Sequence, residues 1–129
     1  MVFSGASLGG NITSGSRLSD SQYTAPILAA YRWHLGCYTG GGSWDGITIL
    51  YAIIGLGNTF KFGNHYGYNR VRQDGSNSWV LDPEVTNQKW IELAGGVSNE
   101  SVAAILDDLY STLPDDRGAP ALAMQARED

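Results

Sequence analysis

Three side chains in this sequence are of the types that perform acyl transfer: Cys37, His65 and Asp82. A cysteine thiolate can attack a carbonyl carbon while an imidazole holds the proton and a carboxylate fixes the imidazole tautomer. His65 and Asp82 lie on either side of a predicted hairpin, where residues of adjacent strands come into contact. These residues define one functional alternative, a cysteine-nucleophile acyl-transfer enzyme.

The order of Cys37, His65 and Asp82 resembles that of papain-like and transglutaminase-like thiol enzymes. The resemblance implies a nucleophilic role for Cys37, a base in His65 and an orienting acid in Asp82, with the base and the acid on paired strands. In those families the cysteine begins a helix, whose positive end stabilises the thiolate. Cys37 instead follows the predicted end of a helix, and we therefore favour a non-enzymatic interpretation.

The segment from Gly5 to Gly9 has the pattern Gly-x-Ser-x-Gly and resembles the nucleophile elbow of lipase-like α/β hydrolases. An elbow requires a strand before the serine and a helix after it. The sequence favours neither here, because only three residues precede Ser4 and the following residues are rich in Gly, Asn and Ser. We expect no elbow at this position.

Tyr66, Tyr68, Arg70 and Arg72 alternate along a predicted strand and would share one face, with Trp79 across the turn. Such side chains bury much area with few torsions, and they could stack on sugar rings, on the bases of a single strand or on another protein. Tyrosine and tryptophan are also ordinary strand residues that cover core edges. We predict these five as ligand- or partner-binding residues, which makes a single-stranded nucleic-acid or sugar binder the third interpretation.

The elements that must position these residues predict an α+β fold. A small antiparallel sheet is expected over about residues 47–93, flanked by helices near residues 25–35 and 99–112. Ile47–Ile54 is rich in β-branched residues and apolar on both faces, which favours a central strand that forms a hairpin with Thr59–Phe62.

Residues typical of turns and helix caps predict the boundaries of the remaining elements. Residues 65–72 and 79–81 are predicted to form a hairpin around the polar turn that contains Asp74. Lys89–Leu93 fits either a strand or a helical turn. Thr24 and Ser98 are expected to cap the two helices.

The domain organisation follows from composition. Residues 1–22, rich in Gly, Ser and Asn, are predicted to form a flexible N-terminal arm, residues 23–114 a single globular domain, and residues 115–129 a charged C-terminal tail. The N-terminus lacks the features of a signal peptide, and no apolar stretch approaches the ~20 residues of a spanning helix. We expect a soluble protein, cytoplasmic or particle-associated, without membrane insertion.

Charge is unevenly distributed along the 129 residues. Residues 1–81 carry five cations and three acids, a net charge of +2, whereas residues 82–129 carry three cations and ten acids, a net charge of −7. Because a distributed positive field is missing, general nucleic-acid binding is not expected. No metal-ligand spacing or phosphate-binding glycine motif is present, so we predict no metal and no cofactor.

The balance of apolar and charged residues points to association. Hydrophobic residues make up 43% of the chain and charged residues only 16%, which indicates that another copy or a protein partner covers part of the surface. The leading interpretation is therefore a non-enzymatic binding or assembly module. We expect a homo-oligomeric structural subunit of a virion-like or other multi-subunit particle.

Overall fold

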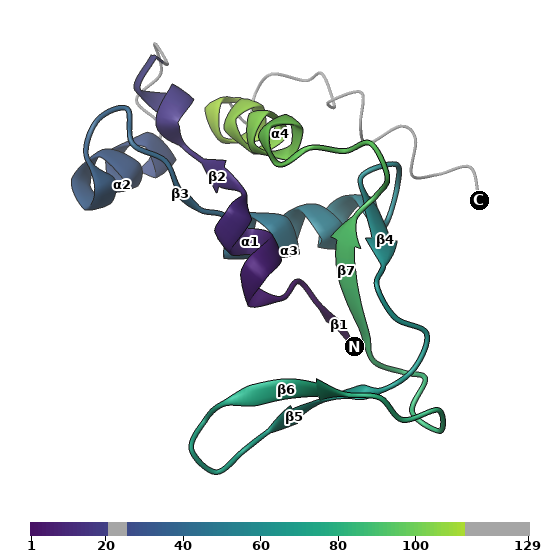
Figure 1. The fold of residues 1–129 in the computed structure, drawn as a ribbon. Coiled ribbons are helices and arrows are strands. Elements are labelled where there is room, and N and C mark those ends of the chain that lie inside the picture. Colours follow the sequence, from purple (N-terminus) through teal and green to yellow (C-terminus); the bar gives the residue numbers. More distant parts are fainter. Residues whose placement is uncertain (21–25, 113–129) are drawn as a thin grey trace.

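The computed structural model describes residues 1–20 and 26–112, and it confirms the predicted α+β class. Its largest sheet has the strand order β1–β7–β4 (Figure 1). β1 (Val2–Phe3) runs parallel to β7 (Lys89–Leu93), and β4 (Phe60–Phe62) runs antiparallel to β7 on its other side. The segment that fitted either a strand or a helical turn is thus the central strand of this sheet.

Helices occur at both positions that the sequence predicts. α2 spans Pro26–Leu35 and α4 spans Asn99–Ser111. The hydroxyl of Ser98 caps α4 by accepting a hydrogen bond from the Ser101 N–H at 3.1 Å, as expected. Thr24, the predicted cap of α2, lies outside the described residues.

The prediction of a strand at Ile47–Ile54 is wrong, because these residues belong to helix α3 (Trp44–Ile54). Ile47, Leu50 and Ile54 are spaced by three and four residues and are all buried, so they form one face of a helix. β-branched residues favour strands only weakly, and burial of this face outweighs that preference. The hairpin expected between this segment and β4 therefore does not form, and β4 pairs with β7 instead.

The main core lies between α3, α4 and the β1–β7–β4 sheet. Its buried side chains are Ile12, Ile47, Leu50, Ile54, Phe60, Ile91, Val102 and Leu106. One of them comes from the N-terminal segment, so residues 1–20 take part in the core.

The N-terminal segment, predicted as a flexible arm over residues 1–22, packs against the domain over the described residues 1–20. It forms β1, α1 (Ala6–Asn11), β2 (Thr13–Ser14) and the 3₁₀ helix η1 (Ser16–Asp20), and β2 pairs antiparallel with β3 (Gly41–Gly42). Ile12 and Leu18 are buried. Gly9 lets α1 approach α3, since an added Cβ would lie 2.6 Å from the Trp44 Cα.

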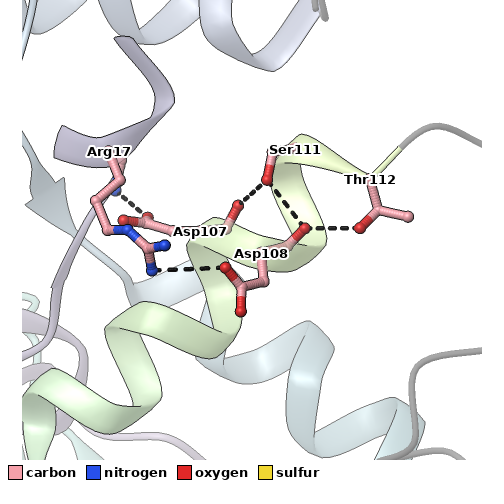
Figure 2. A network of polar contacts seen from close by, with 6 residues as sticks. Arg17, Asp107, Asp108, Ser111 and Thr112 are labelled. Carbon is pink, nitrogen blue, oxygen red and sulfur yellow. Dashed lines mark hydrogen bonds and ion pairs between the residues drawn. The ribbon is translucent and has the colours of Figure 1, made fainter. Parts of the chain in front are cut away.

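A polar network attaches this segment to α4 (Figure 2). The carboxylate of Asp107, only 4% exposed, accepts a hydrogen bond from the buried Gly15 N–H at 2.5 Å. Next to it, Arg17 and Asp108 form an exposed ion pair at 3.5 Å. The hydroxyl of Ser111 donates to the carbonyls of Asp107 and Asp108 at 2.7 and 3.1 Å. α4 therefore holds the chain at the start of η1.

The second predicted hairpin is present and lies apart from the main sheet (Figure 1). β5 (Tyr68–Val71) pairs antiparallel with β6 (Asn77–Val80). In the turn between them, the Asp74 carboxylate accepts hydrogen bonds from the Ser76 N–H and hydroxyl at 3.0 and 2.7 Å. These bonds lower the pKa of Asp74, the hydroxyl bond most. The predicted tail, residues 115–129, lies outside the described residues.

Candidate functional site

The structure does not bring the predicted catalytic cysteine to the predicted base. Cys37 is exposed in the loop between α2 and β3, and His65 is exposed in the connection from β4 to β5. In Figure 1 these two segments lie at opposite sides of the molecule. The described structure shows no hydrogen bond between the Cys37 thiol and the His65 imidazole, and the arrangement offers no support for acyl transfer through this pair.

His65 and Asp82 lie in neighbouring segments, but each makes a hydrogen bond that involves a backbone group and not the other residue. The carbonyl of His65 accepts a hydrogen bond from the Lys89 ammonium. The Asp82 carboxylate accepts the Glu84 N–H at 3.0 Å, which forms a local turn. No hydrogen bond joins the two side chains, so the pair that the acyl-transfer alternative requires is absent from this conformation.

The nucleophile-elbow motif has more structural context than the sequence indicates. β1 precedes it and α1 follows it, and Gly5 has a φ of 67°. The expectation that neither element is present was therefore wrong. Ser7 lies inside α1 rather than on the turn, however, and no histidine is among the residues that line the groove with Ser7, so the motif lacks the geometry of an elbow.

The register of the β5–β6 hairpin divides the five predicted binding residues between two faces. Residues that pair directly across a ladder project to the same side. Tyr68 pairs with Val80 and Arg70 with Ser78, whereas Trp79 pairs with Asn69. Trp79 therefore lies on the face opposite to Tyr68 and Arg70 and cannot extend their surface.

The two arginines of that set differ in their contacts. Arg72 donates to the hydroxyls of Ser76 and Ser78 at 3.3 and 3.1 Å, and thus stabilises the hairpin turn. Arg70 is exposed and makes no ion pair within the described residues. Tyr66 precedes β5 and is partly exposed. Only part of the predicted surface is available for a ligand.

A groove of about 770 Å³ lies between α1, α3, the main sheet and the β5–β6 hairpin. In Figure 1 the hairpin lies below β1 and α1. Asn69, Asn77 and Trp79 of the hairpin line the groove. The side chains that give the groove its chemistry are aromatic, amide and acidic. They are Phe3, Trp44, Trp79, Trp90, Asn11, Asn69, Asn77 and Glu92.

The aromatic side chains of this groove support one another. The rings of Trp79 and Trp90 are 4.7 Å apart at 77°, and those of Phe3 and Trp79 are 6.0 Å apart at 79°, both edge-to-face. Trp44, Trp79 and Trp90 donate their indole N–H groups to protein acceptors at 2.9, 3.4 and 3.0 Å. Because these donors are satisfied internally, the rings are held in place and a ligand would meet their faces and edges.

The groove contains three unpaired amide side chains, whereas its carboxylate and the hydroxyls of Ser4 and Thr48 are hydrogen-bonded. The amide side chains of Asn11, Asn69 and Asn77 form no hydrogen bond within the described part of the chain. Glu92 accepts the Trp90 indole N–H and lies 3.5 Å from the Lys61 ammonium. The indole hydrogen bond is the main cause that lowers the pKa of Glu92, and the nearby Lys61 adds to it. Glu92 is therefore a carboxylate at neutral pH.

Sequence reasoning missed most of this groove. Trp44 was placed before a supposed strand, and Trp90 in a segment whose type was open. One signal was available: the chain has four tryptophans, and three of them gather here. The fourth, Trp33, is 94% exposed on α2.

A second concavity of about 510 Å³ lies between α2, α3 and α4 and is mainly apolar. Ile49 and Ile53, one turn apart on α3, are 59% and 66% exposed there. Ile27 of α2 and Leu109 of α4 line the same groove. These four side chains are referred to below as the α3 face.

Tyr31 and Tyr110 form the polar edge of the α3 face, with their rings 6.0 Å apart. Burial raises the pKa of Tyr110, and Tyr31 adds to the shift. The Tyr110 phenol is therefore uncharged at neutral pH. The charged side chain among the residues that line this groove is Asp45, at the start of α3.

The described residues contain no group of three His, Cys, Asp or Glu side chains placed to hold a metal ion. Within the same ranges, none of the helices has the length and apolar character needed to span a bilayer. Comparison of the chain with protein-family models, with curated proteins and with solved structures found no match.

Proposed function

We propose that this protein is a non-enzymatic binding and assembly module that associates with a second copy of itself through the α3 face. The observation that carries the proposal is the exposure of Ile49 and Ile53, side by side on a helix whose opposite side forms the core. Adjacent exposed isoleucines above an apolar groove mark a surface that binds another apolar surface. A subunit of a virion-like or other multi-subunit particle would use such a face.

A second copy suits this face because the face is self-complementary. In a two-fold contact, charges near the axis meet their own copies and repel. Ile49 is the middle residue of the eleven-residue α3, and the groove's charge, Asp45, lies near one end. In an antiparallel pair centred on Ile49, the two Asp45 side chains would be separated by roughly 12 Å along the axis, beyond the screening length at physiological salt.

The exposed apolar area sets the expected strength. Ile49 and Ile53 are each about two-thirds exposed, so four such side chains in a symmetric pair contribute roughly 4–8 kcal/mol on burial. Association costs roughly 4–15 kcal/mol in lost freedom, which the rest of the interface must help to offset. We expect association in the micromolar range, which corresponds to a net free energy of about 8 kcal/mol and requires the rest of the interface to contribute most of it.

Sedimentation velocity over a concentration series tests the proposal. The native chain should shift from monomer to a larger species at micromolar concentration, and Ile53→Asp should remain monomeric. The matched control is Val71→Asp on β5, because Val71 is 65% exposed but lies outside the α3 face. Added salt should not weaken the association, because the contact is apolar. A native chain that stays monomeric at about 100 µM would overturn the proposal.

The other two interpretations receive less support from the geometry. Acyl transfer needs Cys37 beside His65, and the fold separates the segments that carry them. Nucleic-acid binding through the β5 surface needs several free cations, yet Arg72 is engaged in the hairpin turn. Assembly through the α3 face requires no rearrangement of the described structure.

A further inference from the structure

We infer that the groove between α1, β7 and the β5–β6 hairpin binds a neutral saccharide. This groove shares one lining residue, Trp44, with the groove of the α3 face, and the inference does not depend on self-association. Its volume of about 770 Å³ lies within the range of small-molecule sites in proteins, which is roughly 300–1,000 Å³. Its lining combines aromatic surfaces with a few convergent polar groups, the usual composition of such sites.

The aromatic part of the groove suits the apolar side of a sugar ring. The C–H groups on one side of a pyranose carry partial positive charge, and the face of an indole carries partial negative charge. Trp44, Trp79 and Trp90 line the groove with their N–H groups already bonded inside the protein. Since these donors are occupied, the indoles offer ring surface, and they need no reordering before a sugar stacks on them.

The amide groups suit sugar hydroxyls. Each asparagine side chain has two N–H donors and one acceptor in a plane, which can bind two neighbouring hydroxyl groups at once. Asn11 lines the groove from α1, whereas Asn69 and Asn77 line it from the two strands of the β5–β6 hairpin. Their amides make no hydrogen bond within the described structure, so they are free to bind a ligand at no cost in internal bonds.

The charge of the groove restricts the ligand to a neutral one. Glu92 supplies a carboxylate, and no lysine or arginine is among the lining residues. A phosphate or carboxylate on the ligand would find no lysine or arginine among these lining residues to pair with. A purely apolar ligand would leave the three amides without hydrogen bonds, which disfavours lipids and hydrocarbons. A neutral polyhydroxylated ring satisfies both conditions.

The inference can be tested by measuring the fluorescence of the groove tryptophans while each of several saccharides is added. The full-length chain with Trp33→Phe serves as the reference protein, because Trp33 is 94% exposed outside the groove and would dominate the background. The probes are cellobiose, maltose, lactose and N,N′-diacetylchitobiose, with glucose 6-phosphate as the charged comparison. We expect saturable fluorescence change with at least one neutral disaccharide and none with the phosphate.

Variants locate the binding site. Asn77→Ala in the reference protein removes one exposed groove amide and should weaken binding about five- to tenfold, the effect of losing one or two hydrogen bonds. Asn87→Ala is the matched control, because Asn87 is exposed but lies outside the groove. Its affinity should equal that of the reference. The circular dichroism of both variants should match that of the reference.

Two results would overturn the inference. One is the absence of saturable binding by every neutral disaccharide at millimolar concentration. The other is equal affinity in Asn77→Ala and the reference protein. Sedimentation of the same samples distinguishes failure of this inference from failure of the proposed function. Loss of saccharide binding should leave association through the α3 face unchanged.

Discussion

Replacing Asp107 with alanine should detach residues 12–18 from α4 and destabilise the fold. The Asp107 carboxylate is 4% exposed and accepts the Gly15 N–H at 2.5 Å (Figure 2). Alanine would leave this buried N–H without a partner, and a hydrogen bond to a charged group contributes about 1.5–3 kcal/mol. The carboxylate also has a desolvation cost in the native state, which offsets part of this loss. We expect a reduction of about 2 kcal/mol in the free energy of unfolding.

The neighbouring residue provides the matched control. Asp108 lies on the same helix, and its ion pair with Arg17 joins side chains that are 72% and 61% exposed. Exposed ion pairs contribute about 0–1 kcal/mol, so Asp108→Ala should change stability little. Asp107→Asn keeps a neutral hydrogen-bond acceptor, so its free energy of unfolding should lie between those of the two alanine variants.

Urea unfolding, followed by circular dichroism, measures the three variants. A loss of about 2 kcal/mol at a slope near 1–2 kcal/mol per molar should lower the midpoint of Asp107→Ala by roughly 1–2 M. Hydrogen exchange should show reduced protection of the Gly15 and Leu18 amides in that variant. Equal midpoints for Asp107→Ala and Asp108→Ala would show that the buried carboxylate does not anchor the N-terminal segment.

Two further predictions concern titration and the free thiol. The fold lowers the pKa of Glu92 below its usual 4.5, so the stability that this carboxylate contributes is complete above about pH 5 and is lost as the pH falls through the folded value. Urea midpoints between about pH 5 and 3 should therefore fall less in Glu92→Gln than in the native chain, and parallel curves would contradict the assigned hydrogen bonds. Cys37 is exposed and lies away from His65, so iodoacetamide should alkylate it no faster than a free thiol. Rapid alkylation below about pH 7 would instead support the acyl-transfer alternative.

Local signals in the sequence determined several elements of this protein. α4 has a capping serine at Ser98 and apolar residues at the helical period, and both are properties of neighbouring residues. The β5–β6 hairpin is set by the turn at Asp74, whose carboxylate binds the backbone two residues later. α2 was also correctly placed. These elements could be predicted because the interactions that define them span only a few residues.

The candidate groove could be predicted only in fragments. Trp79 was singled out from its strand, but it was assigned to the surface of Tyr68 and Arg70, and the β5–β6 register places it on the other face. Register depends on which residues pair across the ladder, and a shift of one residue exchanges the two faces. Trp90 joins this groove through tertiary packing, since its ring lies 4.7 Å from that of Trp79.

The type of α3 and the packing of the N-terminal segment were decided by tertiary structure alone. Ile47–Ile54 is apolar on all sides, so its local pattern fits a buried strand as well as a helix. The choice depends on contacts with α4 and the sheet, which bury Ile47, Leu50 and Ile54 as one helical face. Residues 1–20 have few apolar side chains, and their order depends on partners far along the chain, including the Asp107 carboxylate. Such long-range contacts leave no periodic signal in the segments that they order.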